Sequence, residues 1–411
     1  MTISPVPSLA SIPAESAGIR KPASMTLCVI LVVLFLIVTF VAVPALLEQF
    51  MAYRTAGGSI LEKIHPATYL AVISYCIAIF NRRTVERYVE IDRSGHLVIA
   101  LFFFLSLYLS VSGKFYFAAT ALDIVVAPAM ITLAIGMLDR SKIVVVGRVF
   151  IIICLLNLSV VAYEFATKTR IYTYGIESLY FRPAGLFQHP VIAGPLCYCA
   201  MLLAISGVLP SRYQMPVLVA LLVEILLLAV RAPLLVGLLV FGAYLFTASK
   251  RKYGFLIVIG VLAMVPVVVQ GLIDSEILQR VMERGIWDES SNARITIYDA
   301  ISYLTDDEFL SGVEPARADY YVQSTGNKFN ESFFVIALFQ GGIFFAIAYT
   351  AALLMFFMKW MRADLIYAGC VLMVAVAGNG LATKGPIVAA IAVTGCIVYR
   401  LKIQYSANKV I

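Results

Sequence analysis

The sequence predicts an all-α polytopic membrane protein, because of its composition, its long apolar runs and the placement of its basic residues. Of 411 residues, 62% are hydrophobic and only 13% are charged. A water-soluble protein of this length would need more charge to cover its exterior. The seven cysteines all fall in apolar segments, without the spacing of a metal site. We therefore expect them to pack as small residues, with no disulfide framework.

Apolar runs near 20 residues long are the first guide to the topology, because a helix of about 20 residues crosses a bilayer. The first run is longer than the apolar region of a signal peptide, so we expect it to stay as a transmembrane helix. About twelve spans are predicted. They cover residues 25–47, 66–80, 97–113, 115–138, 143–163, 191–209, 215–230, 232–248, 254–272, 332–357, 363–382 and 386–400.

The basic residues orient these spans, because lysine and arginine collect on the cytoplasmic side of membrane proteins. With both termini cytoplasmic, the basic stretches 82–93 and 250–252 fall on the inner side. An odd number of spans would move one of these stretches outside. The short outer loops then hold only Arg54, Lys63, Lys114, Arg231 and Lys384.

Two long loops face the outer side in this topology and hold most of its polar chemistry. In the second loop, short helices are expected at 275–283 and 292–304, the latter capped by Ser290 or Ser291 with Arg294 in its first turn. The predicted divisions are a cytoplasmic tail (1–24), five spans (25–163), a first outer loop (164–190), four spans (191–272), a large outer loop (273–331), three spans (332–400) and a cytoplasmic tail (401–411).

Three arginines in or beside these loops suit a phosphate ligand. Arg182 begins the stretch RPAGLFQHP, in which proline stiffens the backbone and Gly185 permits close approach of a ligand or another backbone. Arg231 stands in a connection with almost no loop, where a charge is costly without a counter-charge. Guanidinium groups bind phosphate bidentately and keep their charge, so Arg182, Arg231 and Arg294 aimed at one place suit a diphosphate.

Each arginine also has an ordinary structural explanation, and Arg294 taken alone is unremarkable. Arg231 is equally a snorkelling residue that marks a helix end. Arg182 is equally a loop residue paired with Glu164 or Glu177. The convergence of the three side chains is therefore the observation that would separate a ligand site from ordinary loop arginines.

Four segments together resemble the motifs of the O-antigen ligase and Wzy-type polymerase superfamily. They are RPAGLFQHP (182–190), the lone Arg231 before a small-residue helix, NARITIYDAISYLTDDEFLSG (292–312) and NESFFVIALFQGG (330–342). The resemblance implies a membrane glycosyltransferase of the C-type architecture. Its donor would be a glycan on undecaprenyl diphosphate, with no nucleotide sugar, metal or other cofactor. By position, Arg182, Arg231 and Arg294 match the family's arginines that handle the donor diphosphate.

The resemblance also implies a location and partners. The protein would be a multi-pass protein of the bacterial inner membrane whose active side faces the periplasm. Its partners would be the undecaprenyl-diphosphate-linked oligosaccharide and membrane lipid, together with a chain-length regulator and an export complex, and no nucleic acid. The residues expected to support the site are Gly185, Tyr298, Gly312 and Asn330.

One departure from the family separates two activities. Family ligases carry a His-Asn pair just before the span that begins here near residue 332, whereas this chain has Asn330-Glu331. This favours a polymerase of repeat units for an exopolysaccharide, capsule or O-antigen over a ligase that transfers the glycan to lipid A core. Gly312-Val313-Glu314 also departs from the family's Gly-x-Gly.

Glycosyl transfer needs a base near the acceptor hydroxyl. Glu331 is the first candidate and His189 the second. Glu331 equally suits the dipole at the start of the next helix, and His189 equally suits a helix cap. Tyrosines of the outer loops, such as Tyr320 and Tyr321, suit either stacking on sugar rings or an interfacial belt.

Two other classes of protein compete with the enzyme. A flippase for the same lipid-linked sugars would place polar residues along several spans and pair broken helices in two halves. A purely structural membrane protein would not need arginines in near-absent loops. The interfacial charge and the one-sided long loops favour an enzyme that faces outward.

Overall fold

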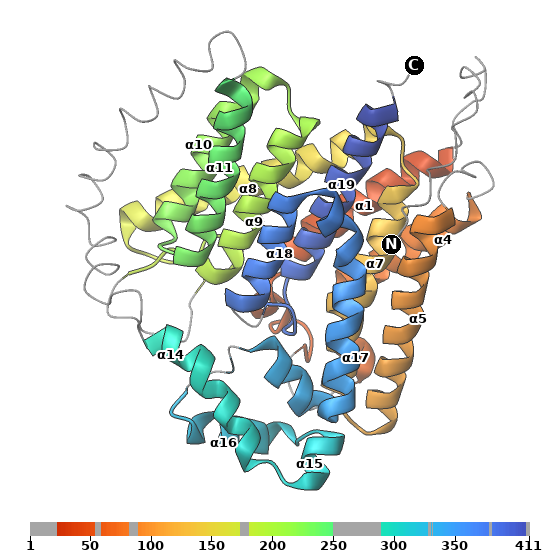
Figure 1. Ribbon diagram of the computed structural model, residues 1–411, viewed down its shortest axis with the longest axis vertical. Coiled ribbons are helices and arrows are strands. Elements are labelled where there is room, and N and C mark those ends of the chain that lie inside the picture. The colour runs from red at the N-terminus through yellow and green to blue at the C-terminus, as the bar shows by residue number, and fades with distance from the viewer. Residues whose placement is uncertain are drawn as a thin grey trace, which may run out of the picture.

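In the computed structural model, a bundle of long helices carries a smaller group of helices at one end (Figure 1). The structure describes residues 23–53, 59–81, 89–172, 181–249, 289–327, 330, 332–377 and 380–407. Within these ranges every regular element is a helix, which confirms the all-α prediction for this part of the chain. Several predictions lie outside the described residues, namely most of the tail 1–24, Arg54, the basic stretches 82–88 and 250–252, the span 254–272, the loop helix 275–283 and Glu331.

Each predicted span on described residues overlaps at least one helix. The bundle contains α1 (Ala23–Val41), α4 (Pro66–Phe80), α5 (Val89–Val111), α6 (Phe115–Ala121), η3 (Leu122–Val126), α7 (Ala127–Gly136), α8 (Arg140–Thr167), α9 (Pro190–Leu203), η4 (Ala204–Val208), α10 (Ser211–Leu227), α11 (Arg231–Ser249), α17 (Phe333–Ala363), α18 (Leu365–Ala377) and α19 (Ile387–Ala407). Two short helices, α2 (Pro44–Leu47) and α3 (Ile60–Lys63), lie between α1 and α4.

Length and composition make this a helical membrane protein. Four stretches are long and apolar enough to cross a membrane, namely Phe115–Gly136, Arg140–Thr167, Pro190–Val208 and Phe333–Ala363. Shorter apolar helices, among them α1, α4 and α11, accompany them. Two helices run past their predicted ends, because α8 continues into the predicted first outer loop and α19 into the predicted C-terminal tail.

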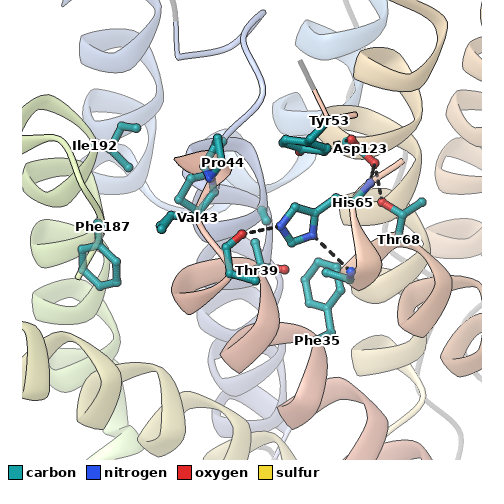
Figure 2. A pocket seen from close by; sticks show the side chains of 15 residues that line it. Phe35, Thr39, Val43, Pro44, Tyr53, His65, Thr68, Asp123, Phe187 and Ile192 are labelled. Atoms are coloured by element: carbon teal, nitrogen blue, oxygen red, sulfur yellow. Dashed lines mark hydrogen bonds between the residues drawn. The ribbon is translucent and has the colours of Figure 1, made fainter. Parts of the chain in front are cut away.

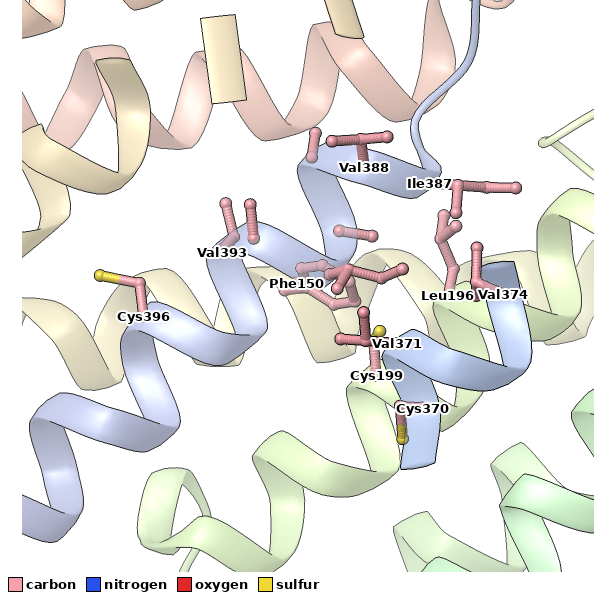
Figure 3. Packing of buried hydrophobic residues seen from close by; sticks show 14 of the residues in the cluster. Phe150, Leu196, Cys199, Cys370, Val371, Val374, Ile387, Val388, Val393 and Cys396 are labelled. Carbon is pink, nitrogen blue, oxygen red and sulfur yellow. The ribbon is translucent and has the colours of Figure 1, made fainter. Parts of the chain in front are cut away.

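The bundle core lies where α8, α9, α18 and α19 meet (Figure 3). Phe150 of α8 is fully buried there among Leu196 of α9, Val371 of α18 and Val388 of α19. Six of the seven cysteines are buried, as predicted for small packing residues, whereas Cys76 is exposed. The core is therefore closed by small and branched apolar side chains.

The group of helices at one end is called the cap. It contains α14 (Glu289–Thr296), the 3-10 helix η5 (Ile297–Tyr303), α15 (Asp306–Ser311) and α16 (Pro315–Ser324), and Figure 1 shows it at the end opposite the C-terminus. Ile297, Val313 and Tyr321 form a small core of the cap with Val335 and Phe339 of α17. Two expectations are corrected here. Ser290 and Ser291 lie inside α14 and do not cap it, and Arg294 lies in its last turn and not its first.

α17 is broken where the cap meets the bundle. Gly342 has φ 81° and ψ −178°, a conformation almost confined to glycine. A Cβ at Gly342 would lie 1.9 Å from the carbonyl oxygen of Leu310 in α15. The part of α17 before the break contributes Val335 and Phe339 to the cap core and Ala337 and Leu338 to the bundle core, so the predicted span 332–357 is broken at the joint between the two.

The chain after α18 turns back inside the bundle. With 13 residues, α18 is about 20 Å long, short of the roughly 30 Å of a hydrocarbon core. Leu381 and Ala382 are buried, and the Tyr349 hydroxyl donates to the carbonyl oxygen of Leu381 at 2.5 Å. Lys384, which the sequence places in a short outer loop, is only 5% exposed. The segment 380–386 is non-helical, as expected of a loop, but Leu381, Ala382, Lys384 and Pro386 in it are buried.

Candidate functional site

The loop that follows Arg182 is held by a buried carboxylate. Glu164, near the end of α8, has no exposed surface. Its Oε2 accepts the N–H groups of Ala184 at 2.7 Å and Gly185 at 2.8 Å, and its Oε1 accepts the N–H of Ile171 at 2.8 Å. Such charge-assisted bonds are strong, and they satisfy amides whose burial would otherwise be costly. Glu164 therefore fixes the backbone on which Arg182 stands.

A second buried side chain, Asn157, holds the same loop. Its Oδ1 accepts the N–H of Leu186 at 2.6 Å, and its Nδ2 donates to Oε1 of Glu224 at 2.5 Å. Gly185 has φ 65°, and a Cβ there would lie 2.3 Å from Asn157 Oδ1. The close approach that Gly185 permits is therefore that of the Asn157 side chain, where the sequence had suggested a ligand or another backbone.

Arg182 reaches the connection between α10 and α11. Its Nε and Nη2 donate to the carbonyl oxygen of Leu228, both at 3.4 Å, and Nη2 also donates to that of Ala229 at 3.3 Å. These bonds are longer than the usual value of about 2.9 Å and therefore weak. Arg231 follows Ala229 by two residues. The structure thus brings Arg182 to the segment that carries Arg231.

The first turns of α9 and α11 also touch at this place. A Cβ at Gly194 would lie 2.6 Å from the Cβ of Pro233. The approach therefore depends on glycine in α9. Because the Arg182 loop leads directly into α9, this contact fixes the loop beside the start of α11.

A further arginine, which the sequence reasoning missed, completes this group. Arg170 Nε donates to the carbonyl oxygen of Arg182 at 2.9 Å, and its guanidinium lies 5.3 Å from the ring centre of Phe181. The Lys168 ammonium lies 4.5 Å from the ring centre of Phe165. The sequence contained one signal that could have identified Arg170. Lys168 and Arg170 are a pair of basic residues just after an apolar helix, on the predicted outer side, where positive charge is disfavoured.

We call Arg170, Arg182, Arg231 and the loop 181–189 the arginine site. Among the described non-glycine residues, only Lys168 (φ 53°), Gln188 (φ 61°) and Ala229 (φ 50°) have a positive φ, and all three lie in or beside this site. Left-handed backbone is uncommon outside glycine and tends to be retained at functional sites. The positive-φ residues outside glycine are therefore concentrated around the arginine site, where Lys168 is the C-cap of α8.

His189 caps the helix that follows the loop. Its Nδ1 accepts the N–H of Val191 at 3.0 Å, which makes it the N-cap of α9. Burial, with a smaller contribution from the positive charge of Arg170, lowers the pKa of His189 to about 4. A ring with this pKa is neutral at pH 7 and takes up a proton weakly, whereas an effective general base has a pKa near the working pH. The structure therefore supports the capping explanation of His189.

Three predicted residues lie in the cap and at the start of α17. Arg294 is partly buried in α14, and α14 lies in the cap (Figure 1). The Tyr298 hydroxyl accepts a bond from Ser332 Oγ at 3.1 Å, and Asn330 Oδ1 accepts the N–H of Ser332 at 3.0 Å. Tyr298 and Asn330 therefore meet at the N-cap of α17, next to the position of Glu331. Convergence of Arg294 with the arginine site stays a prediction.

Gly312 supports the joint between the cap and α17. It has φ 84°, and a Cβ there would lie 2.8 Å from the backbone nitrogen of Gly341. Lys114 Nζ closes the joint, because it donates to the carbonyl oxygens of Ser311 at 2.8 Å and Gln340 at 3.0 Å. The role of Gly312 in the structure is thus to let two backbones approach.

A second polar group, which we call the lysine pocket, consists of Lys384, Asp123, His65, Thr68 and Tyr53, and Figure 2 shows the last four around a small cavity. Lys384 Nζ lies 3.7 Å from Asp123 Oδ2, with side-chain exposures of 1% and 5%. Asp123 Oδ1 accepts the N–H of His65 at 2.9 Å and the Thr68 hydroxyl at 2.7 Å. The Lys384 ammonium also lies 3.9 Å from the ring centre of Tyr53. The charges of Lys384 and Asp123 are therefore paired with each other, and Asp123 also accepts hydrogen bonds within the pocket.

The cavity of the lysine pocket is small and adjoins the arginine-site loop. Its volume of about 30 Å³ holds one or two water molecules. Phe187 of the loop and Ile192 of α9 line the side away from Asp123 and His65, as Figure 2 shows. The cavity is too small for a sugar, so the lysine pocket is a structural centre next to the site.

Among the described residues, no group of three or more His, Cys, Asp or Glu side chains is placed to hold a metal ion. No family model, curated protein or solved structure matches the chain.

Proposed function

We propose that the protein is a periplasm-facing glycosyltransferase of the bacterial inner membrane, with about twelve spans and both termini in the cytoplasm. It polymerises oligosaccharide repeat units carried on undecaprenyl diphosphate into an exopolysaccharide, capsule or O-antigen. The carrier lipid reaches the site from the membrane, and a chain-length regulator and export components act beside the enzyme. This is the architecture of the O-antigen ligase and polymerase superfamily that the sequence motifs resemble.

The approach of Arg182 to the segment of Arg231 is the observation that carries the proposal. Two arginines about 50 residues apart in the sequence come to one short connection, and Arg170 binds the backbone of the first. The bonds of Arg182 to carbonyl oxygens are long, 3.3–3.4 Å. A guanidinium has five N–H donors, so it can exchange weak carbonyl bonds for charge-assisted bonds to phosphate.

The transfer itself assigns a role to this positive charge. The bond from the anomeric carbon of the donor glycan to the diphosphate oxygen breaks, and an acceptor hydroxyl oxygen forms the new bond. The lipid diphosphate leaves with the bonding electron pair, and the hydroxyl proton passes to a base. Preorganised arginines in a poorly hydrated site stabilise the charge that grows on the leaving phosphate. No metal ion or other cofactor is required for this step.

The base is assigned to Glu331, and Asn330 and Tyr298 position the segment that carries it. Support for this choice comes from His189, whose Nδ1 is occupied by the cap of α9 and whose pKa is lowered to about 4. Tyr298 and Asn330 both bond to Ser332, the residue after Glu331. The second half of the site would thus come from the cap, where Arg294 also lies.

The polysaccharides of a strain that lacks the gene test the proposal. The strain is complemented with wild type, Arg182→Ala, Arg231→Ala or Glu331→Gln, and Arg212→Ala serves as the control. Arg212 is an exposed arginine at the start of α10, the opposite end of that helix from the arginine site. We expect the first three variants to lose long polymer and to leave single repeat units on the carrier lipid, with an unchanged lipid A core.

Two other results would replace the proposal. Full-length polymer that accumulates on the carrier and is absent from the lipid A core would identify a ligase. Normal polymer in all variants, each present in the membrane at the wild-type amount, would remove the enzyme and favour a flippase. Failure of repeat units to reach the periplasm in the deletion strain would also favour a flippase.

A further inference from the structure

The cap carries an aromatic stack that is held rigidly. The rings of Tyr303 and Tyr321 lie 6.3 Å apart between centres with an interplanar angle of 10°, and the ring of Tyr320 lies 5.9 Å from that of Tyr321. Tyr321 is 4% exposed, whereas Tyr303 is 47% and Tyr320 66% exposed. Tyr303 therefore has one face on a buried ring and presents its other surface to the outside.

An ion pair fixes the buried ring of this stack. Glu308 Oε1 lies 2.8 Å from Arg317 Nη1, and the Tyr321 hydroxyl donates to Glu308 Oε2 at 2.9 Å. Arg317 Nη2 in turn donates to the Tyr321 hydroxyl at 2.7 Å. Glu308 is itself held by Thr305 in the capping box of α15. A rigid aromatic face loses little conformational entropy when a ligand binds to it.

The charge around the stack limits what it can bind. Between residues 292 and 327 the chain has acidic residues at Asp299, Asp306, Asp307, Glu308, Glu314 and Asp319, but basic residues only at Arg294 and Arg317. The cap is thus acidic, although the whole chain has a formal charge of +7. Anionic lipid headgroups and acidic polymers are repelled by such a surface, and a neutral ligand is not.

We propose that Tyr303 and Tyr320 bind an uncharged sugar ring of the acceptor glycan, a role that rests on the proposed glycosyltransferase activity. One face of a pyranose presents C–H groups, which are apolar and slightly positive, and these pack on the negative face of an aromatic ring. Carboxylates such as Asp306 and Asp307, which are exposed in the first turn of α15, accept bonds from sugar hydroxyl groups. The cap would thereby hold the acceptor while the arginine site holds the donor diphosphate.

Direct binding tests this inference without any transfer reaction. The full-length protein in lipid nanodiscs is titrated with maltoheptaose and chitohexaose as neutral probes and with oligogalacturonate as the acidic probe, and saturation-transfer NMR reports binding. We expect a neutral probe to bind and Tyr303→Ala to weaken it about tenfold. Tyr303→Phe should bind as the wild type, because the ring and its stack remain. Tyr213→Ala, at a tyrosine of 48% exposure on α10, is the matched control and should also bind as the wild type.

The inference is overturned if neither neutral probe binds, if the acidic probe binds as tightly as the neutral ones, or if Tyr303→Ala binds like the wild type. Circular dichroism and thermal unfolding confirm that Tyr303→Ala is folded. Because the assay needs no donor, it separates the two proposals. If the arginine variants make normal polymer, the polymerase proposal fails, but a Tyr303-dependent glycan site would still be detected. If no glycan binds, the sugar-binding inference fails, but the polymerase proposal is untouched.

Discussion

The arginine site and the lysine pocket share a wall at Phe187, yet they treat charge in opposite ways. In the lysine pocket, Lys384 and Asp123 are buried together and cancel each other. In the arginine site, Arg170 and Arg182 donate to neutral carbonyl oxygens, and the buried Glu164 is engaged by backbone N–H groups. A buried ion pair such as Lys384–Asp123 holds helices together, whereas guanidinium groups beside a loop can also contribute a positive field that attracts an anion.

The largest expected effect comes from breaking the pair in the lysine pocket. Lys384→Met leaves Asp123 buried without its counter-charge, so we expect the free energy of unfolding to fall by about 3–5 kcal/mol. Thermal unfolding in nanodiscs measures the change. Lys142→Met, which breaks a more exposed pair with Asp139 at 3.8 Å, should cost less than about 1 kcal/mol. The double change Asp123→Asn with Lys384→Met should recover most of the loss, and an unchanged Lys384→Met protein would refute the structural role.

The next effect concerns the carboxylate of the arginine site. Glu164→Gln replaces one acceptor oxygen with an NH₂ group that faces backbone N–H donors, so we expect a loss of about 2 kcal/mol in stability. Because the Arg182 loop then loses its fixed position, polymer formation should fall further than stability alone explains. Gel profiles of polymer, normalised to folded protein, measure this. Glu314→Gln in the exposed cap should change neither, and equal polymer in both variants would show that Glu164 does not position the site.

The pH dependence of stability follows from His65 in the lysine pocket. Burial, together with the positive charge of Lys384, lowers the pKa of His65 from 6.5 to about 4, against a raising effect of its bond to the carbonyl of Ala42. The unfolded chain therefore binds more protons between pH 6.5 and 4, and stability falls as the pH falls through this range. From pH 6.5 to pH 5 the loss should be about 1.6 kcal/mol.

Thermal unfolding at both pH values tests this, with His65→Asn as the comparison, because asparagine also caps a helix and does not titrate. The pH-dependent loss should be smaller in His65→Asn than in the wild type. The same slope in both proteins would assign the effect to other groups.

The smallest effect separates capping from catalysis at His189. If His189 only caps α9, His189→Asn should keep both stability and polymer formation, while His189→Ala should lose about 1 kcal/mol. Unfolding curves and polymer gels of the two variants decide between the roles. Loss of polymer in both variants, with each protein folded, would make His189 a catalytic base and displace Glu331.

The helices of this protein were predictable because apolar runs of span length are a strong and local signal. The structure brings Arg182 to the segment that carries Arg231, whereas the convergence of the three arginine side chains stays a prediction. The ion pair of Lys384 was not predictable, because its partner Asp123 lies 261 residues away in the chain, and hydropathy treats a lysine near Gly and Pro as an exposed loop residue. Arg170 was missed for the related reason that its role depends on a carbonyl oxygen, which every residue has.

The break at Gly342 has a consequence for how the sequence can vary. Its φ of 81°, and the mere 1.9 Å that would separate a Cβ from the carbonyl oxygen of Leu310, leave no room for any residue but glycine. Two positions later, Phe344 is 72% exposed on the surface of α17. A saturation mutagenesis scan of this helix should therefore find one position that accepts no replacement and, half a turn away, one that accepts almost any apolar side chain. This difference between Gly342 and Phe344 arises from a backbone contact, which a hydropathy profile cannot reveal.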